Sequence, residues 1–248
     1  MQMQGRTILI TGASRGIGAE LAAQLVRKGA TVIGTARRPF EAEGVSPIAL
    51  DLAQPGAPRD LADRIARDYP ACSGLIANAA IMMHTDLTQG THDTEIATEI
   101  ATNLTAPLQL ATALLPQLGR NGPAFVNLVT SGLAIAPRAE AAVYCATKAG
   151  LRSFARSLRN QCHDAGLPVH ISETIMTLVA TTLSRDLPGR YPAQRAAADL
   201  IAGLERERDE IWIERTRLLR LVNRLSPTLA FRILRGPSVR AQLAPQGD

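Results

Sequence analysis

A glycine-rich turn near the N-terminus constrains the fold of this chain more than any other feature. Residues 7–10 (TILI) form the short apolar run typical of a buried parallel strand, and apolar residues recur at helical spacing from Ile17 to Lys28. Gly12, Gly16 and Gly18 lie between these two segments. Glycine lets the backbone turn tightly and approach a phosphate, and the following helix offers free N–H groups and its positive dipole end. The turn therefore predicts an anion-binding strand–helix unit, with a plain connection as the alternative.

Strand-like and helix-like segments alternate through the rest of the chain. The patterns predict strands at 7–10, 31–36, 48–50, 74–77, 124–129, 169–172 and 211–213, and helices at 17–28, 56–68, 95–118 and 144–164, the third of which must accommodate Pro107. Such alternation is typical of right-handed βαβ units. We expect a Rossmann-type α/β fold: a doubly wound parallel sheet of about seven strands with helices on both faces. Residues 1–214 form one domain, with a substrate loop at about 183–195.

Composition excludes several classes of protein. With 248 residues, 46% hydrophobic and 20% charged, the chain is expected to be globular rather than disordered. No apolar run reaches the ~18 residues of a membrane span, and no secretory signal is seen at the N-terminus. Three scattered cysteines argue against a disulfide framework and favour a reducing compartment such as the cytoplasm. The four histidines show no metal-ligand spacing, so we expect no metal site.

The positive charge is concentrated in the tail. Residues 1–210 balance 20 basic against 20 acidic side chains, whereas residues 211–248 hold seven arginines against Glu214 and Asp248, which accounts for the net +5. Leucines and arginines segregate to different faces of the tail, so we expect residues 215–248 to be a basic amphipathic extension that packs on its own domain or a partner subunit. Contact with an anionic membrane surface is an alternative that we rank lower. Few aromatic residues are available to stack on bases, which argues against nucleic-acid binding.

The end of the second predicted strand indicates the cofactor. Dinucleotide sites that take NAD place an acid there for the ribose 2′-hydroxyl, whereas NADP sites use arginine for the 2′-phosphate. Here Arg37 and Arg38 follow the strand, and Arg15 lies in the glycine turn. Guanidinium groups pair with phosphate through two hydrogen bonds, so the pattern favours NADP(H). Ordinary loop charges are the alternative.

A possible catalytic set lies in the fifth strand and the helix after it. Tyr144 and Lys148 stand four residues apart and share a helix face, and Ser131 precedes them by 13 residues. We expect the Lys148 ammonium to lower the phenol pKa from about 10, so that Tyr144 exchanges a proton with a carbonyl or carbinol oxygen. The Ser131 hydroxyl can hydrogen-bond the same oxygen.

Taken together, the glycine spacing and the Ser–Tyr–Lys order resemble the short-chain dehydrogenase/reductase family over residues 6 to about 182. Residues 131–134 and the tail pattern around 217–227 look most like the DltE-like bacterial oxidoreductases in that family. The resemblance implies that Ser131, Tyr144 and Lys148 are catalytic, and that Asn103 holds a water linking Lys148 to solvent. For Asn103, a local backbone contact is the alternative. The cofactor residues implied by turn and resemblance together are Gly12, Ser14, Arg15, Gly16, Ile17, Gly18, Arg37, Arg38, Asp51, Leu52, Asn78, Ala79, Tyr144, Lys148, Val179 and Thr181.

Two departures from the family pattern lie close to these residues. Ala80 stands where the family has glycine, and Met176 and Thr177 replace a Pro-Gly pair. Neither change removes a catalytic group. The residues predict an NADP(H)-dependent oxidoreductase that moves hydride between nicotinamide and a small, mostly apolar carbonyl compound or alcohol, and family likeness suggests a homodimer or homotetramer. The alternatives are a catalytically silent nucleotide-binding or scaffold protein, and a reaction at a C=C bond, an imine or a ring closure.

Overall fold

The computed structural model describes residues 1–83, 86–180 and 190–234, and within them seven parallel strands form one sheet. The strand order is β3-β2-β1-β4-β5-β6-β7. The strands are β1 (Thr7–Thr11), β2 (Thr31–Ala36), β3 (Val45–Ala49), β4 (Cys72–Ala77), β5 (Ala124–Ser131), β6 (Val169–Met176) and β7 (Glu210–Trp212). The chain runs outward in both directions from β1 and β4, so the carboxyl ends of these strands mark the place where doubly wound sheets bind ligands. The predicted fold class is confirmed.

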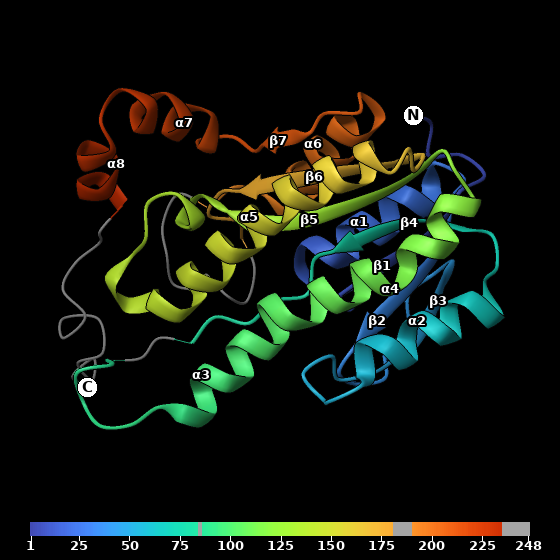
Figure 1. Cartoon of the computed structure of the whole chain (residues 1–248), viewed down its shortest axis with the longest axis horizontal. Coiled ribbons are helices and arrows are strands. Elements are labelled where there is room, and N and C mark those ends of the chain that lie inside the picture. Colours follow the sequence, from blue (N-terminus) through green and yellow to red (C-terminus); the bar gives the residue numbers. More distant parts are fainter. Residues whose placement is uncertain (84–85, 181–189, 235–248) are drawn as a thin grey trace.

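Helices cover both faces of the sheet (Figure 1). One face carries α2 (Ala57–Asp68), α4 (Ala106–Arg120) and α5 (Ala142–Asp164), and the other carries α1 (Gly16–Arg27) and α6 (Ala193–Glu205). Side chains alternate along β1: Leu9 packs in the first core, whereas Ile8 and Ile10 pack in the second. Burial on both faces explains why the strands read as continuous apolar runs rather than as alternating ones.

The predicted helix over 95–118 is interrupted. The structure has α3 (Asp93–Ile100), then a π-helical turn, η1 (Ala101–Thr105), and then α4. Pro107 lies in the first turn of α4 and carries no N–H for the carbonyl of Asn103, four residues earlier. One regular α-helical hydrogen bond is therefore lost at that point, where the structure has the widened turn.

The helix α6 (Ala193–Glu205) was not predicted from the sequence. Its apolar side chains Ala196, Leu200 and Leu204 follow helical spacing and are buried in the core that α1 shares. The helix begins at Ala193, so the predicted substrate loop at 183–195 ends earlier than expected. Residues 183–189 of that loop lie outside the described residues.

The tail begins with a fixed first turn. Thr216, at the start of α7 (Thr216–Leu225), is buried, and its hydroxyl donates to the carbonyls of Ile213 (2.7 Å) and Ile175 (3.1 Å). Farther along α7, Leu218 and Leu225 are 64% and 87% exposed, and α8 (Pro227–Leu234) follows. No helix of the described residues is both long and apolar enough to cross a membrane.

Candidate active site

The glycine turn connects β1 to α1 at the carboxyl edge of the sheet. Gly12 and Gly16 have φ values of +71° and +58°, which side-chain-bearing residues rarely adopt. A Cβ on Gly18 would lie 2.0 Å from the carbonyl oxygen of Gly12, so the helix packs directly on the turn. Arg15 precedes the helix without a side-chain cap, and the first helical turn contains no acid. The N-terminus of α1 therefore offers N–H groups and a positive dipole end to an anion.

Hydrogen bonds join the carboxyl ends of β1 and β4 beside this turn. The Thr11 hydroxyl accepts from the backbone N–H groups of Asn78 and Ala79, both at 3.0 Å. The Asn78 side-chain amide donates to the Thr11 carbonyl at 3.1 Å. Asn78, a predicted cofactor residue, thus also holds the turn in place. Thr11 was not predicted, although its position at the carboxyl end of a strand is a signal that the sequence contains.

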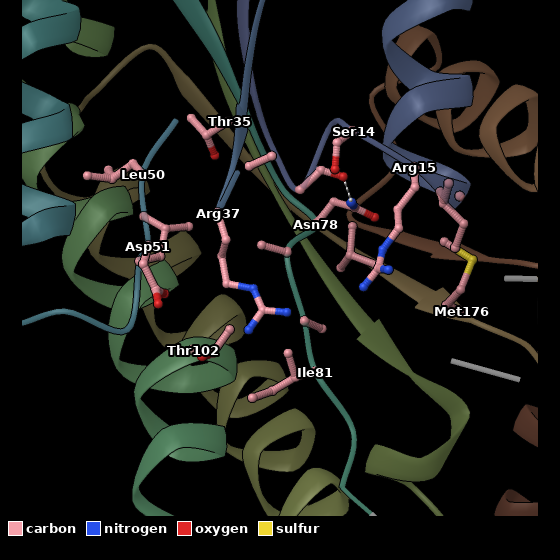
Figure 2. A pocket seen from close by; sticks show the side chains of 18 of the residues that line it. Ser14, Arg15, Thr35, Arg37, Leu50, Asp51, Asn78, Ile81, Thr102 and Met176 are labelled. Atoms are coloured by element: carbon pink, nitrogen blue, oxygen red, sulfur yellow. Dashed lines mark hydrogen bonds between the residues drawn. The ribbon is translucent and has the colours of Figure 1, made fainter. Parts of the chain in front are cut away.

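A single pocket extends from the glycine turn to the start of α5. Arg15 and Arg37 reach into it from different sides (Figure 2). The predicted site residues that line it are Gly12, Ser14, Arg15, Gly16, Ile17, Arg37, Asp51, Leu52, Asn78, Ala79, Tyr144 and Lys148. Gly18, Arg38, Asn103, Ser131 and Val179 are not among the lining residues, and Thr181 lies outside the described residues.

Further residues line the pocket without having been predicted as cofactor residues. They are Thr35, Ala36, Leu50, Ala80, Ile81, Thr102, Val129, Thr130 and Met176. Most stand at or just after the carboxyl end of a strand, which is the positional signal that finds them. Ala80 and Met176, two of the three residues that depart from the family pattern, therefore line the predicted cofactor site, whereas Thr177 does not.

Tyr144 and Lys148 share one face of α5, as their spacing predicts. The Lys148 Nζ atom lies 5.6 Å from the centre of the Tyr144 ring and donates to the carbonyl of Val129 at 2.8 Å. Lys148 is 2% exposed, and burial lowers its pKa to about 8. Ser131 ends β5, and its hydroxyl accepts from the N–H of Leu133 at 3.2 Å. Tyr144 and Lys148 thus line the pocket, and the Ser131 side chain lies next to Tyr144.

The expected lowering of the Tyr144 pKa is wrong for this structure. Burial raises the pKa of the phenol above its ordinary value, and the neighbouring Ser131 side chain only partly opposes that effect. The ammonium of Lys148 is itself desolvated and directed at a backbone carbonyl. Loss of water around the phenol therefore outweighs attraction to a cation one helical turn away.

Asn103 is fully buried in η1, and its side chain bonds to the backbone of one residue and, through Nδ2, to the Thr147 hydroxyl at 3.4 Å. Its Oδ1 accepts from the N–H of Ile81 at 2.9 Å, and its Nδ2 donates to the carbonyl of the same residue at 2.7 Å. These two bonds fix the segment after β4 that lines the pocket. The side chain thus fits the alternative reading, a local backbone contact, and its part in a proton relay stays a prediction.

Comparisons with known proteins agree with this geometry. The family model described as short chain dehydrogenase matches residues 6–190. An uncharacterized oxidoreductase, DltE, from Bacillus subtilis is 35% identical over 235 residues, which cover 89% of this chain and 92% of the relative. The structure resembles a short chain dehydrogenase from Burkholderia cenocepacia in complex with NADP (TM-score 0.85, 22% identity, 96% of this chain and 100% of that one). It also resembles one from Sphingobium yanoikuyae in complex with NADPH (TM-score 0.76, 22% identity, 91% and 95%). This chain belongs to the short-chain dehydrogenase/reductase family of oxidoreductases.

Proposed function

We propose that this chain is an NADP(H)-dependent oxidoreductase that moves a hydride between nicotinamide and a carbonyl compound or secondary alcohol. One observation carries the proposal: a single pocket joins an uncapped helix N-terminus, two arginines and a Tyr–Lys pair whose lysine is buried. The first two features suit a phosphorylated dinucleotide, and the third suits proton transfer at a substrate oxygen. The two ends of the pocket thus match the two partners of a hydride transfer.

The residues at the dinucleotide end fit NADP(H) better than NAD(H). Arg37 follows β2 and lines the pocket together with Arg15, whereas no carboxylate stands at the end of that strand. The structural neighbours bound to NADP and NADPH support the same choice. When bound, the nicotinamide supplies or accepts the hydride.

The protein's own groups handle the proton. A raised pKa keeps the Tyr144 phenol protonated at neutral pH, so it is ready to donate to a carbonyl oxygen that gains negative charge. The Ser131 hydroxyl orients that oxygen. Lys148, with a pKa of about 8, is mostly charged at pH 7 and stabilises negative charge on the phenol oxygen after proton transfer. This arrangement favours carbonyl reduction at neutral pH, whereas alcohol oxidation needs the phenolate and accelerates as pH rises.

The substrate proposed is a small, mostly apolar carbonyl compound or alcohol. Ile81 and Met176 line the same pocket as Tyr144 and Lys148. Apolar side chains at these two positions suit an apolar substrate body. A homodimer or homotetramer in the cytoplasm completes the proposal.

Cofactor choice is tested by binding. The Kd values of NADPH and NADH are measured by cofactor fluorescence for wild type, Arg37→Ala and the neighbouring control Arg38→Ala. We expect Arg37→Ala to weaken NADPH at least about tenfold, because a charge-assisted pair is lost, and to leave NADH unchanged. Arg38→Ala should bind both like wild type, since Arg38 does not line the pocket. Equal NADPH affinity in wild type and Arg37→Ala would contradict the assignment.

Chemistry is tested by turnover. Wild type is assayed for carbonyl-dependent NADPH oxidation across a panel of apolar ketones and aldehydes, and Tyr144→Phe should lose this activity while still binding NADPH. If wild type binds NADPH tightly but turns over no compound in the panel, the nucleotide-binding or scaffold alternative prevails. If Tyr144→Phe keeps the activity, Tyr144 is not the acid.

A further inference from the structure

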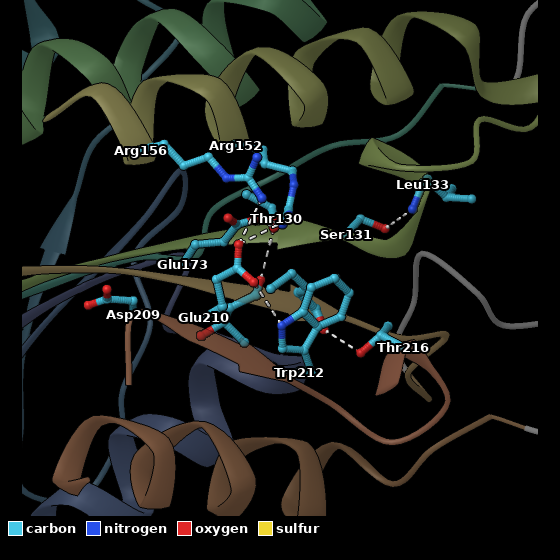
Figure 3. Close-up of polar contacts among 12 residues, drawn as sticks. Thr130, Ser131, Leu133, Arg152, Arg156, Glu173, Asp209, Glu210, Trp212 and Thr216 are labelled. Atoms are coloured by element: carbon cyan, nitrogen blue, oxygen red, sulfur yellow. Dashed lines mark hydrogen bonds and ion pairs between the residues drawn. The ribbon is translucent and has the colours of Figure 1, made fainter. Parts of the chain in front are cut away.

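A second pocket, separate from the first, lies between α5, β7 and α7. Figure 3 shows Arg152 and Arg156 extending from α5 toward Glu210 and Trp212 on β7. The lining residues are Ala134, Ile135, Arg152, Arg156, Glu210, Trp212, Arg220, Asn223 and Arg224, and none of them lines the first pocket. Four arginines facing one carboxylate is an unusual lining, since like charges gathered in one place repel each other.

The two arginines from α5 are already neutralised. Arg152 forms an ion pair with buried Glu173 and a second one with Glu210 at 3.2 Å, and Arg156 pairs with Glu210 at 2.8 Å. Glu173 also accepts from the hydroxyl of Thr130 at 2.8 Å. Two guanidinium groups are therefore matched by two carboxylates on this wall of the pocket.

The two arginines from α7 have no such match. Arg220 and Arg224 stand one helical turn apart, and within residues 1–83, 86–180 and 190–234 neither forms an ion pair with a carboxylate. Counted with Glu173, which pairs with Arg152 but does not line the pocket, the four arginines exceed the carboxylates by two charges. An anion with two negative charges would neutralise the excess and turn repulsion between α5 and α7 into attraction.

Trp212 orients one of these arginines. The ring lies against the guanidinium carbons of both Arg152 and Arg220, each 5.3 Å from its centre, and its Nε1 donates to Glu210 at 3.1 Å. Stacking uses the flat face of a guanidinium and leaves the N–H groups at its edge free to bind an acceptor. Arg220, an exposed side chain, therefore contacts the ring without using its hydrogen-bond donors.

We propose that this second pocket binds the phosphate group of a phosphorylated ligand. A phosphate ester carries close to the two negative charges that the pocket lacks, and its oxygens match the paired N–H groups of guanidinium. The pocket wall at Ala134 and Ile135 belongs to the segment just after Ser131, so an occupied pocket stands beside the substrate end of the active site. The proposal does not depend on the choice between NADP and NAD.

The pocket contains its own reporter, because Trp212 is the only tryptophan of the chain. Wild type is titrated with pyrophosphate while tryptophan fluorescence is followed, with sodium acetate of equal ionic strength as the reference. We expect a saturable signal that weakens as sodium chloride is added. The double variant R220Q/R224Q should lose at least tenfold in affinity, whereas R232Q, which removes an exposed tail arginine outside the pocket, should behave like wild type.

Two outcomes would overturn the proposal: no saturable signal in wild type, or equal affinity in wild type and R220Q/R224Q. A signal lost in R37Q but kept in R220Q/R224Q would do the same, because it would place the anion in the first pocket. Circular dichroism and thermal unfolding check that R220Q/R224Q is folded, so a lost signal reports on the pocket.

A second arm identifies the source of the phosphate. Co-sedimentation with vesicles of phosphatidylcholine, with and without phosphatidylglycerol, is compared for the same variants. Binding that needs phosphatidylglycerol, Arg220 and Arg224, and that pyrophosphate displaces, assigns a lipid headgroup to the pocket. A pyrophosphate signal without vesicle binding assigns a soluble phosphorylated compound. Vesicle binding that survives in R220Q/R224Q overturns the lipid assignment.

Discussion

The buried ammonium of Lys148 leads to a prediction about stability rather than activity. Lys148 is 2% exposed, and its Nζ donates to the carbonyl of Val129. Among the described residues no carboxylate forms an ion pair with it, so burial of the charge is opposed by one backbone hydrogen bond. Replacing it by a neutral side chain of similar length, in Lys148→Met, should therefore give a more stable protein that lacks the lysine we propose to act in catalysis.

The size of the effect follows from the pKa. Burial lowers the pKa of Lys148 from 10.5 to about 8, a difference that corresponds to about 3 kcal/mol of unfolding free energy. Below pH 8 the lysine is charged in both the folded and the unfolded chain, and the full penalty applies. Between pH 8 and 10.5 the folded protein has lost the proton while the unfolded chain keeps it, so stability rises with pH.

Methionine carries no proton, so the two proteins should differ in a pH-dependent way. At pH 7 we expect Lys148→Met to be more stable than wild type by about 2 kcal/mol, because loss of the hydrogen bond to Val129 offsets about 1 kcal/mol of the gain. The advantage should shrink as pH rises from 8 toward 10.5. The buried cysteines also titrate in alkali, but they are present in both proteins and cancel in the difference.

Urea unfolding of the ligand-free proteins between pH 6 and 10 measures this difference. The matched control is Lys28→Met, because Lys28 is the only other lysine and its side chain is 45% exposed beside Glu205. That variant should change stability by at most about 1 kcal/mol, with no trend across pH 8 to 10. Lys148→Met that is no more stable than wild type at pH 7, or an advantage that stays constant to pH 10, would refute the reasoning.

Two further substitutions test the scaffold of the two pockets. Gly18→Ala places a Cβ 2.0 Å from the Gly12 carbonyl oxygen and should lower the free energy of unfolding in urea by at least about 3 kcal/mol. The control is Gly119→Ala, where the nearest atom lies 3.3 Å from the added Cβ, and it should change that free energy by less than about 1 kcal/mol. Similar values for both variants would contradict the packing argument. Glu173→Gln removes a buried partner of Arg152 and should cost about 3 kcal/mol. A loss below 1 kcal/mol would show that Glu210 alone neutralises that arginine.

The strands were predictable because their signal is local. Ile8, Leu9 and Ile10 are each buried, on alternate faces, so a continuous apolar run was the right pattern to expect of a parallel sheet with two covered faces. The glycine turn was predictable for a related reason. Gly12 and Gly18 stand where a Cβ would meet backbone atoms, and such close approach restricts the residue type itself.

Features that depend on tertiary contacts were harder to predict. Pro107 indicated an irregularity in the long helix. Whether the helix kinks, breaks or widens there depends on the residues that pack around it. In this structure, Asn103 connects the widened turn to Ile81 by hydrogen bonds. The pKa of Tyr144 is a similar case. The i, i+4 spacing to Lys148 is visible in the sequence, whereas the desolvation that outweighs the ammonium comes from burial by the whole fold.

Buried polar groups near the first pocket fall into two classes, and the difference separates scaffold from chemistry. Asn103 meets both the N–H and the carbonyl of one residue, so its burial is compensated by hydrogen bonds that also shape the pocket wall. Lys148 is different: its charge is desolvated, it has one neutral acceptor, and its pKa is displaced to about 8. A group held in the fold at a net loss of stability, on the wall of a pocket and beside a phenol, is what a functional role predicts. Arg220 and Arg224 belong to neither class, because both are exposed; the second pocket is distinguished instead by the excess of arginines over carboxylates in its lining.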